Sequence, residues 1–89
     1  MNKSVSISVS GRVQGVAFRY SAQSLANNLG LKGFVRNMSD GSVYIEVEGQ
    51  PHNVDAYIEW CRKGPSRAEI ENIFINPIPE QHFTGFLIR

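Results

Sequence analysis

The stretch from Gly11 to Arg19 joins a predicted strand to a predicted helix and lacks the residues that usually begin a helix. No Ser, Thr, Asp or Asn lies between Gly11 and the helix, so its first N–H groups have no side-chain acceptor. Arg19 also places a positive charge in the first turn, where the helix dipole favours an anion. A bound phosphate would correct both faults, with Gly11 and Gly15 letting the backbone fold around it and Arg19 donating a bidentate pair of hydrogen bonds. The alternative is that these are ordinary turn glycines and Arg19 is a solvated surface residue.

Asn37 stands at the end of a predicted strand, shortly before the turn signal Asp40-Gly41. Its simplest role is to support the hairpin turn. Its carboxamide also offers a donor and an acceptor without charge, which suits it to hold a water molecule against an electrophile. The residue alone leaves both interpretations open.

The other candidate residues are predicted to be structural. His52 and His82 have no cysteine or carboxylate at metal-ligand spacing, which favours surface positions and no metal site. Cys61 lies in an apolar helical stripe, which favours a small buried side chain over a nucleophile. Glu46 and Glu48 share the outer side of their strand and are interpreted as solvated charges.

Alternating apolar and polar residues predict strands, and apolar residues at helical spacing predict two amphipathic helices. The expected elements are a strand over 4–10, a helix over 18–29 ended by Gly30, strands over 33–36 and 42–48 joined by a turn, a helix from Pro51 ended by Gly64-Pro65, and strands over 67–75 and 86–89. A slip in the apolar phase of the strand over 67–75 predicts a bulge near Glu71 or Asn72.

Each of these strands has one apolar side, and two helices can cover one face of a sheet. The order therefore predicts an α+β fold, a ferredoxin-like two-layer sandwich of βαββαβ order with an antiparallel sheet and a short extra C-terminal strand. We expect residues 1–89 to form a single domain.

The charge balance and the cysteine content disfavour several classes of protein. Nine Lys and Arg against eight Asp and Glu give a net charge of +1, too small a surplus for a protein that holds nucleic acid by its phosphate backbone. A small RNA-binding α+β domain would also need an aromatic platform, which the sequence does not offer. The lone Cys61 fits a reducing compartment, and no long apolar run follows Met1. We therefore expect a cytoplasmic protein with no membrane or nucleic-acid partner.

Two separated motifs occur in order, Gly11-Arg12-Val13-Gln14-Gly15-Val16-x-Phe18-Arg19 and Gly33-x-Val35-Arg36-Asn37-x-x-Asp40-Gly41-x-Val43. Together they closely resemble the acylphosphatase family. The resemblance extends along nearly the whole chain, to Gly49, Trp60, Gly64-Pro65 and the ending Phe86-x-Ile88-Arg89. Departures are mild, since Phe34 stands where tryptophan is frequent and Tyr44 replaces a common glutamate.

The resemblance implies an acylphosphate phosphohydrolase, a hydrolase acting on acid anhydrides. Its substrate would be a small-molecule acyl phosphate, its products a carboxylate and inorganic phosphate, and it would need no metal or other cofactor. By position, Arg19 would bind the phosphoryl group and Asn37 would position the attacking water. The phosphate-binding loop would be the backbone of Gln14, Gly15, Val16, Ala17, Phe18 and Arg19. A monomer is expected. The rival is a module of the same fold that binds an anion or a protein without turnover, and the intact Arg19 and Asn37 argue against it.

Overall fold

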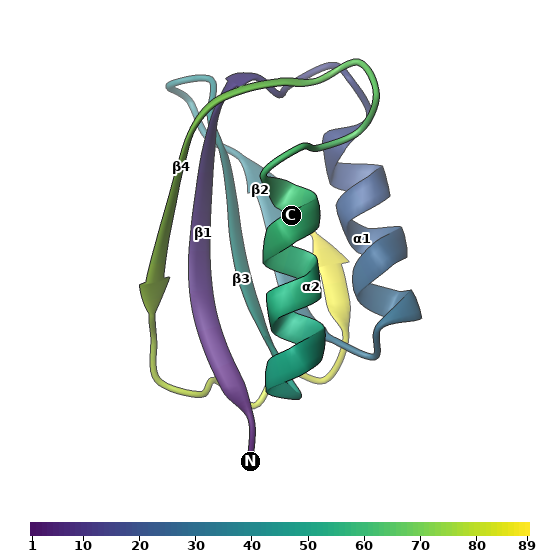
Figure 1. Cartoon of the computed structure of the whole chain (residues 1–89), viewed down its shortest axis with the longest axis vertical. Helices are drawn as coiled ribbons and strands as arrows, with labels where there is room; N and C mark the ends of the chain where they lie inside the picture. The colour runs from purple at the N-terminus through teal and green to yellow at the C-terminus, as the bar shows by residue number, and fades with distance from the viewer.

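The computed structural model describes all residues from 1 to 89 and has two helices and five strands in the predicted order. These are β1 (Lys3–Arg12), α1 (Phe18–Asn28), β2 (Lys32–Asn37), β3 (Val43–Gly49), α2 (Pro51–Cys61), β4 (Glu69–Pro77) and β5 (Phe86–Ile88). Both helices lie on the same face of one sheet (Figure 1). The predicted two-layer α+β sandwich is therefore confirmed.

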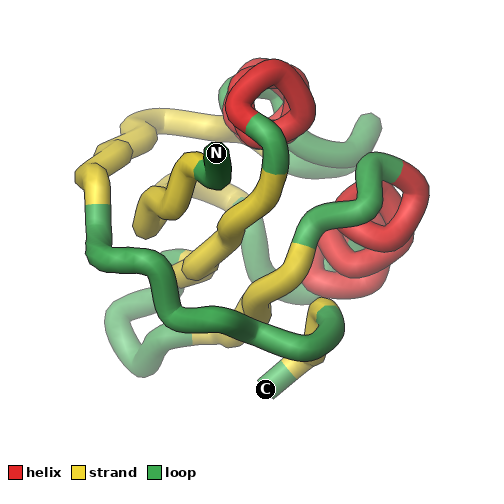
Figure 2. Tube along the Cα trace, turned by 90° about the horizontal axis from the view of Figure 1, so that it is seen from below, coloured by secondary structure: helices red, strands yellow, loops and turns green.

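The sheet has the strand order β4-β1-β3-β2-β5. The pairs β4–β1, β1–β3 and β3–β2 are antiparallel, as predicted, whereas β5 runs parallel to β2. This direction follows from the path of the chain. After β4, residues 78–85 cross the end of the sheet and reach the far edge (Figure 2). As the arrows in Figure 1 show, β5 therefore runs in the direction opposite to β4.

The predicted bulge lies at Glu71. Ser10 pairs with Asn72 and Gly11 with Ile70, which leaves Glu71 without a partner on β1. At this point a Cβ on Gly11 would collide with the backbone carbonyl oxygen of Glu69, and Gly11 has φ of +124°. Gly11 therefore serves the close approach of two strands, and it lies within β1, before the loop begins.

The core lies between the sheet and the helices. Helix α1 packs on β2 and β5, and α2 packs on β1 and β3. The buried apolar side chains follow the predicted periodicities, and they include Val5, Ile7 and Val9 of β1, Val43, Ile45 and Val47 of β3, Phe18, Ala22 and Ala26 of α1, and Val54, Tyr57, Ile58 and Cys61 of α2. The hydroxyl of Tyr57 donates a hydrogen bond to the carbonyl oxygen of Ala22 at 3.1 Å, which links the two helices.

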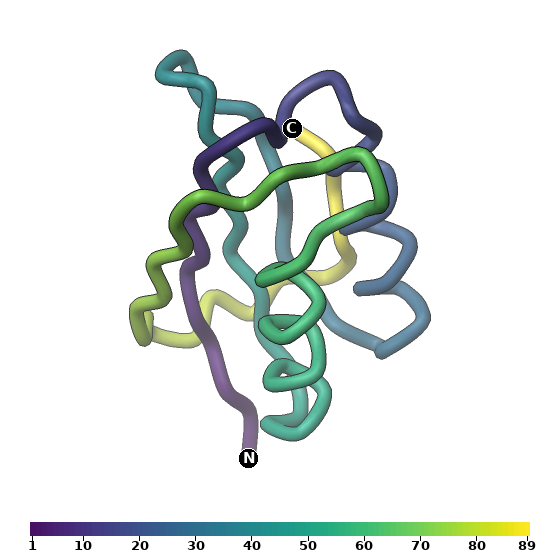
Figure 3. The backbone as a smooth tube through the Cα atoms, turned by 45° about the horizontal axis from the view of Figure 1, so that its top comes forward, coloured from purple at the N-terminus to yellow at the C-terminus, as the bar shows by residue number.

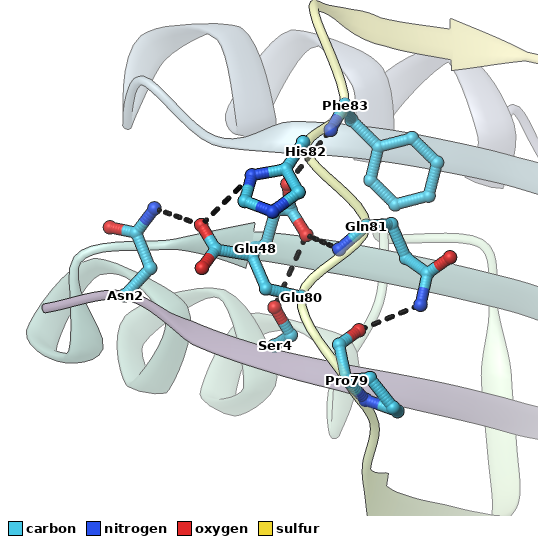
Figure 4. Close-up of polar contacts among 8 residues, drawn as sticks. All are labelled: Asn2, Ser4, Glu48, Pro79, Glu80, Gln81, His82 and Phe83. Carbon is cyan, nitrogen blue, oxygen red and sulfur yellow. Dashed lines mark hydrogen bonds and ion pairs between the residues drawn. The ribbon is translucent and has the colours of Figure 1, made fainter.

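Glu48 is buried, with only 3% of its surface exposed, so its interpretation as a solvated charge is wrong. Its carboxylate accepts hydrogen bonds from the backbone N–H groups of Gln81 and Phe83, both at 2.8 Å, and from the hydroxyl of Ser4 at 3.2 Å (Figure 4). Burial alone would raise the pKa of Glu48, but these hydrogen bonds and the nearby His82 outweigh it and hold the pKa below its ordinary value. Glu48 thus ties the segment before β5 to the sheet.

The ends of β1, β2 and β5 and the beginning of α1 meet at one end of the molecule. Figure 3 shows the loop between β1 and α1 beside the C-terminus at this end. The fold therefore brings the two motifs together, although β3 separates β1 from β2 in the sheet.

Candidate active site

Helix α1 begins without a side-chain cap, as the sequence predicts. Ala17 occupies the N-cap position with φ of +62°, makes no capping hydrogen bond, and is followed by a first turn with no acidic residue. The first helical hydrogen bond runs from the N–H of Ser21 to the carbonyl oxygen of Ala17 at 3.0 Å. None of the backbone N–H groups from Gln14 to Tyr20 donates to another group of the protein. These donors are free to bind a ligand.

The loop conformation favours an anion. Gly15 and Ala17 have φ of +74° and +62°, and Val16 between them does not have a positive φ. An alternation of this kind can turn successive N–H groups toward the same side and so form an anion-binding concavity. The helix dipole adds positive potential at the same place. The loop and the start of α1 together can therefore hold a phosphate-sized anion.

A cavity of about 240 Å³ lies beside this loop. Its lining includes five of the predicted site residues, Gly15, Ala17, Phe18, Arg19 and Asn37, together with Val13, Tyr20 and Ile88. Arg19 is the single charged side chain among them; it is exposed and makes no ion pair or hydrogen bond within the protein. Its guanidinium is thus available to a ligand.

Gln14 and Val16, also assigned to the loop, do not line the cavity. Val16 is buried in the hydrophobic core and anchors the loop to it. The side chain of Gln14 points to the β2–β3 turn, where its Nε2 donates to the carbonyl oxygens of Met38 and Ser42 at 2.8 and 2.9 Å. Nothing in the sequence indicates that the side chain of Gln14 contacts this turn, because both acceptors are backbone carbonyl groups.

Asn37 is the last residue of β2 and lines the cavity. Its Oδ1 atom is buried and has no hydrogen-bond partner. A buried amide oxygen without a donor costs about 1 to 3 kcal/mol, so such groups are rare and point to a role with a ligand or water. The turn that follows does not use the side chain of Asn37, which argues against a purely structural role.

The turn is held instead by Asp40. Its Oδ1 accepts hydrogen bonds from the backbone N–H and the hydroxyl of Ser42 at 2.9 and 2.6 Å. The side-chain hydrogen bond from Ser42, followed by the backbone one, lowers the pKa of Asp40. The N–H of Met38 donates to the carbonyl oxygen of Ser42 at 2.8 Å, and Gly41 adopts φ of +95°. The predicted Asp-Gly hairpin is confirmed.

The residues predicted to be structural lie away from the cavity. His52 and His82 are exposed, and Cys61 is fully buried in α2, where burial raises the pKa of its thiol. A thiol held neutral in the core is a poor nucleophile. No group of three or more His, Cys, Asp or Glu side chains is placed to hold a metal ion. Neither helix has the length and apolar character needed to cross a bilayer.

Comparison with known proteins places this chain in a family. The family model described as Acylphosphatase matches residues 5–88. An acylphosphatase of Anaeromyxobacter dehalogenans is 52% identical over 84 residues, 93% of this chain and 90% of the relative. An acylphosphatase of Nocardioides sp. is 43% identical over 89 residues, 100% of this chain and 90% of the relative. The structure of an acylphosphatase from Coxiella burnetii superposes with a TM-score of 0.95 at 33% identity, covering 99% of this chain and 93% of that one.

The protein is therefore a hydrolase of the class that acts on acid anhydrides. More narrowly, the chain belongs to the acylphosphatase family, and its substrate is a small-molecule acyl phosphate.

Proposed function

We propose that the chain hydrolyses the carboxyl–phosphate bond by in-line attack of a water held by Asn37 on a phosphoryl group held by Arg19 and the backbone of residues 14–19. One observation carries this proposal. The N–H groups from Gln14 to Tyr20 are unpaired, and they lie next to an arginine that also has no partner. A phosphoryl group supplies acceptors of the kind that these donors lack.

The phosphoryl group needs positioning and charge stabilisation above all, because its transition state is loose and spreads negative charge over the equatorial oxygens. The loop N–H groups and the guanidinium of Arg19 meet these oxygens. The leaving group is a carboxylate, a weak base with a pKa of about 4, so it departs without a proton. The cavity accordingly needs no general acid, and none of its lining residues is acidic.

Asn37 supplies the other half of the reaction. Its carboxamide has no partner in the protein, so it can turn to accept an O–H of a water in the cavity without losing an internal hydrogen bond. The water oxygen forms a bond to phosphorus, and the bond to the acyl oxygen breaks with its electron pair staying on the carboxylate. The water proton passes to a phosphoryl oxygen, so the products are a carboxylate and inorganic phosphate and no covalent intermediate forms.

Two substitutions separate these roles. Phosphate at a hundred times its dissociation constant should stabilise the native protein by about 2.7 kcal/mol, a rise in Tm of roughly 10 °C or more for a chain of this size. Arg19→Gln should remove most of this protection and most of the turnover of benzoyl phosphate. Asn37→Ala should keep the protection while kcat falls by about a hundredfold, because only the alignment of water is lost.

Arg12→Gln is the matched control, since it removes the same charge from an exposed pair with Glu69. It should keep both phosphate protection and turnover. Near-normal turnover in Arg19→Gln would show that the phosphoryl group binds elsewhere. Equal loss of protection in the Arg19 and Asn37 variants would disprove the division of roles.

We also propose that residues 1–89 act as a single monomeric domain in the cytoplasm, without cofactor or nucleic acid. The burial of the lone Cys61 and the net charge of +1 support this proposal. Phe34 is only 7% exposed, and the guanidinium of Arg89 lies 4.3 Å from the centroid of its ring, so the ring offers no free face for a nucleobase. Light scattering should give the mass of one chain, and a dimer mass would contradict the monomer.

A further inference from the structure

The side chain of Gln14 joins two parts of the site that come from different elements. Its Nε2 donates one hydrogen bond to the carbonyl oxygen of Met38 and one to that of Ser42, at 2.8 and 2.9 Å. Both protons of the amide are thereby used. Met38 directly follows Asn37, and the N–H of Met38 donates to the same carbonyl oxygen of Ser42. Gln14 thus contacts the backbone immediately after the residue assigned to the attacking water.

Without the side chain of Gln14, the two parts of the site are connected only indirectly, through the sheet. The loop that holds the phosphoryl group follows β1, whereas Asn37 ends β2, and β3 lies between these two strands. A twist of the sheet or a small shift of the turn would change the distance between the two halves of the site. In-line attack depends on that distance, because a misplacement of about 1 Å can cost a hundredfold in rate.

We propose that Gln14 is a positioning residue, which sets the water-holding Asn37 relative to the phosphate-binding loop. The inference rests on the proposed function of Asn37 and adds a second role to Gln14, whose backbone belongs to the loop. The two hydrogen bonds of its side chain fix the turn against the loop, so they act on the alignment of the reaction and not on the binding of phosphate.

The test replaces Gln14 with Met, which has nearly the same length and volume but no donor. The variant should lose about tenfold or more in kcat for benzoyl phosphate, with little change in KM and with phosphate protection against heat preserved. Gln23→Met is the matched control. Gln23 is also a half-buried glutamine that donates through Nε2 to a backbone carbonyl oxygen, that of Phe86 at 3.0 Å, but it does not touch the turn. It should keep kcat within about twofold.

A double-mutant cycle tests whether Gln14 acts through Asn37. When Asn37 is Ala, Gln14→Met should cause no further loss of kcat, because the alignment that it maintains is already gone. If the two substitutions lower kcat by independent factors that multiply in the double variant, the proposal is overturned. Loss of phosphate protection in Gln14→Met would also overturn it. If Gln14→Met does not fold, Gln14→Asn is used in the same cycle, since its amide is one methylene too short to reach both carbonyl groups.

Different results would refute this inference and the proposed function. Normal kcat in Asn37→Ala alone would refute the proposed function, whatever Gln14 does. Normal kcat in Gln14→Met beside a strongly impaired Asn37→Ala would refute only the positioning role.

Discussion

Replacing Glu48 with Gln should destabilise the protein strongly, although the change keeps the size and shape of the side chain. The carboxylate accepts two backbone N–H groups at 2.8 Å and one hydroxyl at 3.2 Å in a site that is 3% exposed. A glutamine keeps one acceptor oxygen, and its NH₂ group would face a second buried N–H donor. Hydrogen bonds to charged groups contribute about 1.5 to 3 kcal/mol, and a buried donor without an acceptor costs about 1 to 3 kcal/mol. The free energy of unfolding should therefore fall by about 2 to 4 kcal/mol, and Tm by at least 10 °C or so.

Urea and thermal unfolding followed by circular dichroism measure this loss. Glu46→Gln is the matched control, since Glu46 lies two residues earlier on the same side of β3 and accepts a single hydrogen bond, from the hydroxyl of Tyr44 at 2.7 Å. A glutamine oxygen can accept that bond, so this variant should change stability by less than about 1 kcal/mol. Equal and small effects in both variants would refute the idea that Glu48 holds the segment before β5.

The same carboxylate predicts a dependence of stability on pH. The folded protein holds the pKa of Glu48 below its ordinary value of 4.5, so the folded state binds the proton less readily than the unfolded state. The stabilisation is therefore complete above the ordinary value and is lost as pH falls through the lower folded value. The difference in unfolding free energy between wild type and Glu48→Gln should therefore shrink as the pH falls below about 4.5. A difference that grows on acidification would contradict this sign.

Two further predictions concern the chemistry. Turnover of benzoyl phosphate should survive exhaustive EDTA treatment, because the chain offers no cluster of metal-ligating side chains and the carboxylate leaving group needs no Lewis acid. Loss of turnover on chelation that one divalent ion restores would contradict the mechanism. Cys61→Ser should destabilise by about 1 to 3 kcal/mol through burial of a hydroxyl, yet the folded protein should keep its kcat; a thousandfold fall in a folded variant would reveal a missed catalytic group.

Much of the fold could be predicted from the sequence because the relevant signals are local. The alternation in β1 and β3 follows from a sheet with helices on one face, and it identifies the buried side of each strand without knowledge of its neighbours. The break in the apolar alternation near Glu71 likewise predicted a bulge, and the register of β1 and β4 confirms it. The parallel direction of β5 could not be predicted in this way, because it depends on the path of residues 78–85, which have no period.

Burial of polar residues was harder to predict than burial of apolar ones. The parity of β3 places Glu48 on the side away from the helices, and this placement is correct. What covers it there is the segment around Gln81 and Phe83, more than thirty residues further along the chain, which binds the carboxylate through backbone N–H groups. Every residue but proline carries such a group, so the partner of Glu48 leaves no mark in the sequence.

The two halves of the site illustrate the same distinction. The missing N-cap before Phe18 is a local signal, since a capping side chain must lie next to the helix that it caps, and its absence correctly predicted free N–H groups at the start of α1. Two glycines in that segment look alike in sequence, yet Gly15 shapes the loop while Gly11 accommodates the carbonyl group of Glu69. The link from Gln14 to the turn after Asn37 is non-local and ends on carbonyl groups, so it becomes visible only in the fold. The chemistry of each half can thus be predicted from its own residues, whereas their alignment, on which the rate of in-line attack depends, is a property of the tertiary structure.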